Sequence, residues 1–363
     1  MNGAPELRLL ARLSKSQRGL SLVELMIALA LSATLIFGIF TVYLDSSRTA
    51  RMSAALARTQ EAARIATDIM ARDMRMVGFQ GCADPDDVTL NIIADNPPTS
   101  DFFETTLRGW EVTDGAWADG TEFDGPGSDI EAEAVVGSDV ISVQRGETME
   151  IELTGNMSAD NANIQVQGDD VVRFAKNDIV MISDCEAADL FRISSQPSSN
   201  TWAHANNVNS TNRLSQAYTD SARIMRFSSS VYYVADTGRD DTRGNDIFAL
   251  YRQINNLDGT AQNPQEIVEG VENLQIEYGE LLGTNNVRYR PADEVGNMAS
   301  VVALRIGMLI SNADPVRDDN DTSDYALPGE TITEASGGGT VTHPEDQRLR
   351  RTFVTTVMLR NRD

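Results

Sequence analysis

Residues 19–44 read GLSLVELMIALALSATLIFGIFTVYL, an apolar stretch with one charged residue, Glu24, near its start. A helix needs about 20 apolar residues to cross the hydrocarbon core of a bilayer. The run from Leu20 to Leu44 is long enough to do so. The stretch therefore predicts a single membrane-spanning helix at the N-terminus, with the rest of the chain behind it.

The residues before this stretch are polar and mostly basic: Glu6, Arg8, Arg12, Lys15 and Arg18. Positive charge beside a membrane helix stays in the cytoplasm, so the chain after Leu44 is expected on the far side. A secretory signal peptide has a shorter apolar core followed by its cleavage site. Here the small residue Gly19 precedes the apolar run, and a cut there leaves the whole run on the mature chain.

Glu24 is unusual, because a carboxylate at the centre of a membrane helix costs about 2.5 to 3.5 kcal/mol on insertion scales. Near the helix end the cost is smaller. Two interpretations stay open on this residue alone. Its side chain reaches the interface and does nothing more, or it pairs with a positive group such as an α-amino terminus made by cleavage.

Residues Gly19-Leu20-Ser21-Leu22-Val23-Glu24 resemble the prepilin peptidase site of type IV pilins and type II secretion pseudopilins. The resemblance implies cleavage after Gly19 and methylation of the new terminus at Leu20. It also implies that Glu24, fifth in the mature chain, pairs with a terminus, its own or a neighbour's. The family usually has Phe where this chain has Leu20. Major pilins also carry a Pro in this helix, and none lies in residues 20–84, which favours a minor subunit.

The helix is predicted to continue to Val77, since no Pro or Gly interrupts residues 39–77 and Gly78 follows. One apolar face is expected to pack on a globular head: Met52, Leu56, Ala63, Ala66, Met70, Met74 and Val77. Arginines alternate with Glu61, Asp68 and Asp73 on the remaining surface. In a filament the first half would pack on copies of the same segment, and a screw operation between subunits gives open fibres.

From Gly81 onward short strands and turns dominate, with no fixed repeat. The fold class is therefore α+β: a leader (1–19), a long helix (20–78, transmembrane over 20–44) and a β-rich periplasmic head (79–363). Strands are predicted at 139–145, 151–154, 164–167, 171–175, 179–183, 191–194, 224–235, 246–253, 272–278, 301–310 and 351–360. Residues 265–271 are either a strand or a helical turn.

Cys82 and Cys185 are the two cysteines of the chain. In an exported protein an even count predicts a disulfide. It would close a loop of about a hundred residues and contribute about 4 to 5 kcal/mol in the chain-entropy model. Two unrelated buried thiols are the alternative.

Four further segments resemble one narrower family, the PilW minor pilins of type IVa systems: residues 72–82, 177–185, 268–279 and 353–362. The resemblance implies a minor pilin, anchored in the inner membrane, that helps to prime pilus assembly and lies at the fibre tip. It implies as partners the prepilin peptidase, other minor pilins, a PilY-type tip adhesin and the inner-membrane assembly platform. Cys82 and Cys185 would then join the helix end to the head.

The composition argues against several other functions. A net charge of −24 repels phosphate, so no nucleic-acid binding is expected. His204 and His343 stand in no zinc spacing, and there is no P-loop or GxSxG motif, so neither an enzyme nor a cofactor is predicted. The acidic residues 318–324 are interpreted as a solvated loop, with a calcium site as the less favoured alternative. No metal is expected.

Two alternatives to a minor pilin remain. A J-type minor pseudopilin of type II secretion shares the leader, helix and β-rich head. A membrane-tethered periplasmic enzyme or binding protein would need a pocket with converging groups, and it leaves Gly19 and Glu24 unexplained.

Overall fold

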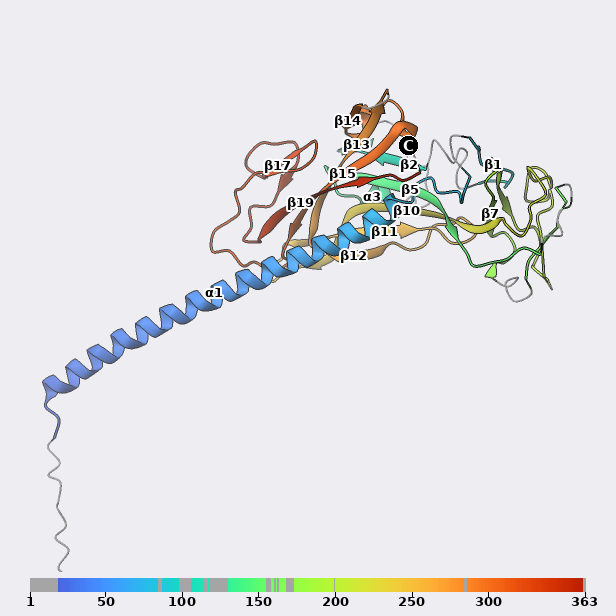
Figure 1. Ribbon diagram of the computed structural model, residues 1–363. Helices are drawn as coiled ribbons and strands as arrows, with labels where there is room; N and C mark the ends of the chain where they lie inside the picture. Colours follow the sequence, from blue (N-terminus) through green and yellow to red (C-terminus); the bar gives the residue numbers. More distant parts are fainter. Residues whose placement is uncertain are drawn as a thin grey trace, which may run out of the picture. The chain divides into compact units, whose positions relative to one another are not determined.

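The computed structural model describes residues 19–83, 87–97, 106–113, 116–117, 130–154, 158–159, 161, 163–167, 173–198, 200–283 and 286–361. Residues 1–18 of the predicted leader, and the predicted strand start at 171–172, lie outside the described residues. The chain divides into two compact units, of which the first ends at Arg51 and the second begins at Met52 (Figure 1).

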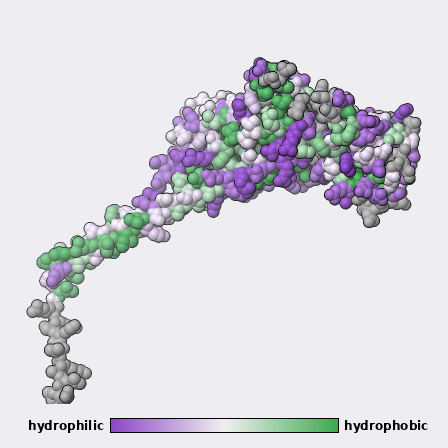
Figure 2. All heavy atoms as spheres, in the orientation of Figure 1, coloured by the Kyte–Doolittle hydropathy of each residue, from purple (hydrophilic) through white to green (hydrophobic). Residues whose placement is uncertain are grey.

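The first unit is the N-terminal part of one long helix, α1 (Leu22–Met74). Large apolar side chains from Leu22 to Leu44 are exposed all around the helix, and Figure 2 shows them as a continuous hydrophobic surface. This part is long and apolar enough to cross a membrane. The hydroxyls of Thr34 and Thr41 bond back to carbonyls one turn earlier, at 2.9 Å each, which satisfies their polar groups within the helix.

The second unit contains the rest of α1, and here one helix face is buried: Ala55, Thr59, Ala63, Ala66, Met70, Ala71, Asp73 and Met74. The spacing of three and four residues is that of a helix packed along one side. A turn follows, and Gly78 ends it with a φ of 73°, a left-handed conformation that favours glycine. The predicted long helix is therefore present, with residues 75–78 in a turn.

The head is mainly β-structure. Its strands are β1 (Asn91–Ile92), β2 (Leu107–Trp110), β3 (Val112–Thr113), β4 (Ala116–Trp117), β5 (Val140–Thr148), β6 (Asn163–Gln165), β7 (Ile179–Ser183), β8 (Ala188–Arg192), β9 (Thr201–Ala203), β10 (Arg223–Asp240), β11 (Asp246–Ile254), β12 (Gln265–Glu269), β13 (Val271–Leu282), β14 (Asn286–Arg290), β15 (Val301–Ser311), β16 (Tyr325–Ala326), β17 (Thr331–Glu334), β18 (Thr342–His343) and β19 (Arg350–Met358). Short helices are α3 (Ile130–Glu133), η2 (Ala292–Glu294) and η3 (Met298–Ser300).

Two sheets carry the head. The larger runs β1-β8-β7-β10-β11-β12, with β5 on the other edge of β10 and β2 beyond it. The smaller is antiparallel and runs β14-β13-β15-β19. The chain passes from one sheet to the other at Gly270, whose φ is 88° and whose added Cβ would lie 2.4 Å from the carbonyl oxygen of Ser311. Only glycine fits this crossing.

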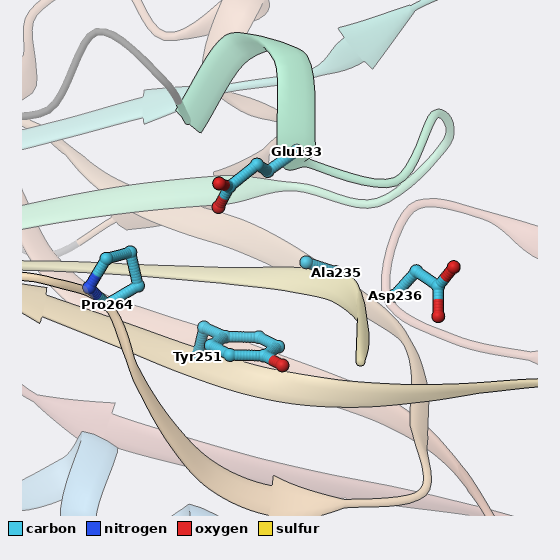
Figure 3. A pocket seen from close by; sticks show the side chains of 5 residues that line it. All are labelled: Glu133, Ala235, Asp236, Tyr251 and Pro264. Carbon is cyan, nitrogen blue, oxygen red and sulfur yellow. The ribbon is translucent and has the colours of Figure 1, made fainter. Parts of the chain in front are cut away.

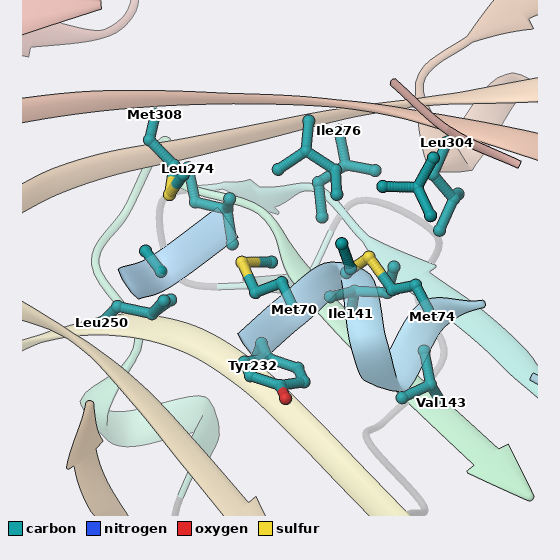
Figure 4. Close-up of a cluster of buried hydrophobic side chains, with 14 of the residues drawn as sticks. Met70, Met74, Ile141, Val143, Tyr232, Leu250, Leu274, Ile276, Leu304 and Met308 are labelled. Carbon is teal, nitrogen blue, oxygen red and sulfur yellow. The ribbon is translucent and has the colours of Figure 1, made fainter. Parts of the chain in front are cut away.

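The end of α1 lies between the two sheets and completes their core (Figure 4). Met70 and Met74 extend from the helix. One layer of side chains around them comes from β13 and β15, including Ile276 and Leu304, and the other from β5, β10 and β11. The predicted packing of the second half of α1 on the head is confirmed by these contacts.

Asp73 was predicted on the polar surface of α1, and this is wrong. The residue is only 3% exposed. Arg145 on β5 lies 2.9 Å from its carboxylate and Arg252 on β11 lies 3.6 Å away, while the Tyr232 hydroxyl on β10 donates to it at 2.6 Å. Burial and the neighbouring Asp73 raise the pKa of Tyr232. The carboxylate can be buried because two partly buried arginines and a buried hydroxyl pair with it.

The acidic residues 318–324 do not all form the predicted solvated loop. Asp321 is fully buried, accepts a 2.7 Å hydrogen bond from the Tyr325 hydroxyl, and lies 3.4 Å from the guanidinium of Arg350. Arg350 and Arg348 are themselves 2% and 1% exposed. Their carboxylate partners come from separate parts of the head: Asp241, Glu272, Asp321 and Asp346. This buried ion network joins residues 312–349 to β13.

The long strands were mostly predicted correctly, and the short ones only in part. The prediction at 179–183 coincides with β7, those at 164–167 and 191–194 overlap β6 and β8, and the segment 265–271 contains the strand β12 (Gln265–Glu269). Leu153 forms only an isolated bridge in the predicted strand 151–154, and Arg173 lies in a 3-10 turn. Residues 196–218 and 312–339, where no strand was predicted, contain β9, β16 and β17.

We expect Asp73→Asn to destabilise the head by about 3 kcal/mol, because a buried arginine charge loses its partner. Asp68→Asn is the matched control, since Asp68 is 62% exposed and contributes little. Urea denaturation of the detergent-solubilised full chain, followed by fluorescence, measures the difference. Equal midpoints for the two variants would contradict the anchoring role of Asp73.

Candidate functional site

The start of α1 brings Ser21 and Glu24 together. The Ser21 amide donates to the Glu24 carboxylate at 3.0 Å, and the Glu24 amide donates to the Ser21 hydroxyl at 3.2 Å. This reciprocal pair is a capping box, which satisfies two amide groups that a helix start leaves without partners. Glu24 therefore has a structural partner inside the chain, and Ser21 is a further residue of this site, as the N-cap of the helix.

Gly19 and Leu20 precede the helix and are exposed. A Cβ added to Gly19 would meet no atom within 4 Å, and its backbone is not in the left-handed region. Within the described chain, neither packing nor backbone conformation requires glycine there.

Cys82 and Cys185 form a disulfide, with Cα atoms 4.8 Å apart and a sequence separation of 103 residues. Cys82 follows the turn that ends α1, and Cys185 follows β7. Gly81, just before Cys82, has a φ of 90°, and a Cβ there would lie 3.1 Å from the Ser183 hydroxyl oxygen. The bond therefore joins the segment after α1 to the turn between β7 and β8 of the large sheet, and the alternative of two separate thiols is wrong.

The buried Asp139 and the half-buried Glu111 lie side by side. Asp139 accepts a hydrogen bond from the Ile276 amide at 2.6 Å, and Glu111 accepts one from Ala292 at 2.9 Å. Burial first, and then the charge of Glu111, raises the pKa of Asp139 well above its usual range. Tyr278 is buried next to Asp139 and Glu111. A Cβ added to Gly109 would lie 1.9 Å from the Tyr278 hydroxyl oxygen. The pair is enclosed in packed structure, and we assign it to the fold.

A pocket of about 440 Å³ opens between α3 and strands β10 and β11 (Figure 3). The described residues that line it are Glu133, Ala235, Asp236, Tyr251 and Pro264. The hydroxyl of Tyr233, whose ring stacks on Tyr251 with centroids 5.8 Å apart, donates to Glu133 at 3.0 Å. Among those described lining residues there is no Ser, Thr, Cys, His or Lys. They offer an acidic, aromatic surface and no nucleophile beside a base.

The two histidines lie in different parts of the head. His204 is fully buried after β9, and burial lowers its pKa to about 4, so it is neutral near pH 7. His343 on β18 contacts the carbonyl oxygens of Ser323 and Pro344 at 2.9 and 3.0 Å. Within the described ranges, no group of three His, Cys, Asp or Glu residues is arranged to hold a metal ion.

Two family models match the two ends of the chain, and one solved structure is similar over most of its length. The family model of the type IV pilus-assembly protein W matches residues 231–361, and the model of the prokaryotic N-terminal methylation motif matches residues 14–40. A solved structure, the type IV-like pilin TTHA1219 from Thermus thermophilus, is similar with 14% identity and a TM-score of 0.34. The similarity covers 84% of this chain and 96% of that one. No curated protein matches the sequence.

The methylation motif spans Gly19, Leu20, Ser21 and Glu24 and extends into the exposed apolar part of α1. The match to protein W begins within β10 and ends after β19. It therefore covers the whole smaller sheet and the buried ion network of Arg348 and Arg350.

Loss of the disulfide should destabilise the head by about 4 to 5 kcal/mol, because the unfolded chain regains the freedom of a loop of 103 residues. Cys82→Ser with Cys185→Ser, in the full chain in detergent, is compared with the oxidised wild type by urea denaturation. Wild type with reductant should behave like the double variant. An unchanged midpoint in both samples would show that the bond adds no stability.

Proposed function

We propose that the chain, which is a type IV pilin-like protein with a PilW domain, is a minor pilin that primes pilus assembly and stays at or near the fibre tip. The observation that carries this proposal is the conjunction of two features in one helix. A methylation motif stands at its start, and its other half forms the core of the head. One helix thus carries both the proposed processing site and part of the core of the head.

Processing is proposed to occur between Gly19 and Leu20. Gly19 is exposed, and nothing in the described chain requires glycine there. A peptidase that binds the backbone closely would require it, since any side chain obstructs such an approach. The head is proposed to lie in the periplasm. The basic residues before Gly19 favour a cytoplasmic N-terminus, which puts the head on the other side of the membrane. The disulfide in the head is also stable in an oxidising compartment such as the periplasm.

Glu24 is proposed to pair with an α-amino terminus during assembly. Its carboxylate already accepts a hydrogen bond from the Ser21 amide, one residue from the terminus that cleavage creates at Leu20. In an apolar surrounding an ammonium group competes well with a neutral amide for a carboxylate, because the charged bond is the stronger. The new terminus of the same chain, or that of a neighbour, would therefore take over the carboxylate.

The exposed apolar part of α1 is proposed to leave the membrane and pack on the same segment of other subunits. The segment is compatible with lipid and with the interior of a filament, because its backbone groups are bonded within the helix and its side chains are apolar. A prepilin peptidase, other minor pilins, a PilY-type adhesin and the inner-membrane assembly platform are the partners this function requires. The absence of Pro from residues 20–84 favours a minor over a major subunit.

A J-type pseudopilin of type II secretion remains the second candidate, since it shares the anchor. The match of residues 231–361 to the protein W family favours the pilus. Deletion of the gene separates the two: loss of twitching with normal secretion supports the pilus, and loss of secretion with normal twitching supports the pseudopilin.

The N-terminal residue of the membrane-extracted protein is the first test of processing. Mass spectrometry should find N-methylated Leu20 in cells with an active prepilin peptidase. Gly19→Leu should leave the leader attached, because its side chain blocks the approach to the bond. Gly38→Leu is the matched control, as that glycine is equally open in the same segment. A shortened Gly19→Leu product, or an intact Met1 in the wild type, would refute the site.

Glu24→Ala should be processed normally but incorporated poorly into fibres, because the carboxylate that pairs with a terminus is lost. The same change also removes half of the capping box, so Ser21→Ala serves as the control. It removes the hydroxyl cap, at a cost of about 1 kcal/mol to the helix start, and keeps the carboxylate. Immunoblots of sheared fibres measure incorporation. Normal incorporation of Glu24→Ala into fibres would contradict the proposed pairing with an α-amino terminus. Equal loss of incorporation in Glu24→Ala and Ser21→Ala would show that the effect comes from helix capping.

A further inference from the structure

The last strand of the smaller sheet, β19, has a neighbour on one side only. It pairs with β15 in unbroken antiparallel register, from Ser311 opposite Arg350 to Ala303 opposite Met358. On its other side no strand pairs with it among the described residues, and no backbone group of residues 351–358 bonds to a described residue outside β15. β16 approaches its first residues but pairs with β17. The strand is therefore an open edge.

The register shows which backbone groups face this edge. The Leu359 amide donates to the Val302 carbonyl at 2.9 Å, just beyond the end of the strand. In an antiparallel ladder, residues bonded to one neighbour alternate with residues whose N–H and C=O groups point away from it. Val354, Thr356 and Met358 thus present their backbone groups to the open side.

The edge lacks the devices that usually protect such strands. Residues 352–359 contain no charge and no Pro, and the pairing with β15 has no bulge. Val354 and Met358 are 55% and 60% exposed. Natural edge strands are normally short, charged, bulged or covered, because an open flat edge pairs with other chains. An edge of this length and composition is suited to receive another strand.

The charges at the two ends of β19 select the kind of strand. Arg351 and Arg360 are exposed, and neither forms an ion pair with a described residue. If β19 of a second copy paired antiparallel with it, the strand end that carries Arg360 in one copy would meet the end that carries Arg351 in the other. Each end of such a ladder would then hold two positive charges and no carboxylate, which is unfavourable. A strand with carboxylates near both ends and uncharged residues between them meets both arginines with opposite charge.

We propose that β19 is a docking edge for an extended, acid-flanked strand of another protein, which adds to the smaller sheet next to Val354, Thr356 and Met358. Backbone hydrogen bonds supply the affinity of such strand addition, and the flanking charges and alternate side chains supply the specificity. This inference rests on the geometry of the head alone. It goes beyond the proposed function, because it holds whether or not the chain enters a fibre.

The test uses the full chain in detergent and two synthetic peptides of alternating valine and threonine. One has aspartates at both ends, and the other has lysines in their place. Fluorescence anisotropy should show the aspartate peptide binding at least about tenfold more tightly than the lysine peptide. Equal binding of the two peptides, or no binding of the aspartate peptide, overturns the proposal.

Variants locate the binding on the edge. Thr356→Pro removes one outward N–H group while keeping the hydrogen bonds to β15. It should lower the affinity for the aspartate peptide about tenfold. Val354→Lys, which puts a charge on the edge, should do the same if the proline variant does not fold. Val136→Lys is the matched control, because Val136 is 56% exposed in a turn. Unchanged binding in the folded edge variants refutes the docking edge.

Charge reversal tests the selection of the partner. Arg351→Glu combined with Arg360→Glu should invert the preference and favour the lysine peptide. Arg351→Glu alone gives each end of a ladder between two copies one positive and one negative charge, so sedimentation should then detect self-association that the wild type lacks. A preference that does not invert shows that the arginines do not select the strand, and overturns that part of the proposal.

Discussion

The head depends on the position of the last turns of α1, and the contacts of Asp73 fix that position. Apolar packing alone lets a helix slide or rotate at modest cost, since Met70 and Met74 are adaptable side chains. A buried carboxylate is different, because it must meet Arg145, Arg252 and the Tyr232 hydroxyl or lose several kcal/mol. These partners come from β5, β11 and β10. One residue of the helix therefore sets its register against three strands of the large sheet.

A second buried network, that of Arg348 and Arg350, fixes the position of β19 in the smaller sheet, as Asp73 fixes the position of the helix. Arg350 starts β19 and contacts Glu272 on β13 at 2.6 Å and Asp346 at 2.7 Å. Arg348 contacts Asp241 at 3.0 Å, before β11. The chain is strongly acidic overall, and these two arginines allow several of its carboxylates to be buried. Burial of ions gives little net stability, but it makes alternative packings costly.

Much of the fold was predictable from local patterns. The long helix, β7, β10, β11, β13, β15 and β19 all follow from apolar runs and breakers in neighbouring residues. What sequence reasoning missed depends on partners far along the chain. Asp73 looks like any surface aspartate until β5 places Arg145 beside it, 72 residues later. The short strands β9, β16 and β17 lie in segments rich in Asn, Ser and Asp, where pairing is decided by what they cover.

The N-terminal site was predictable because its motif is contiguous. Gly19, Leu20 and Glu24 were named from their resemblance to a prepilin peptidase site, and the disulfide of Cys82 and Cys185 was predicted from the even number of cysteines and the expected compartment. Ser21 was missed, although a Ser followed three residues later by Glu is itself the signature of a capping box. The carboxylate drew attention to a charge in a membrane helix and away from its local hydrogen bonds. The edge of β19 was missed because strand order decides which strand lies last.

Two surfaces of this chain are apolar and uncovered, and the state of their backbones dictates what can cover each. In the first part of α1 every turn satisfies its own peptide groups, so lipid tails or the apolar side of another helix complete it without further hydrogen bonds. Along β19 the outward peptide groups of Val354, Thr356 and Met358 have no described partner. Neither lipid nor a helix surface supplies the missing donors and acceptors. Only water or another extended backbone does, and only the second also covers the exposed Val354 and Met358. The two surfaces therefore select different classes of partner, and they do so before any side-chain specificity is considered.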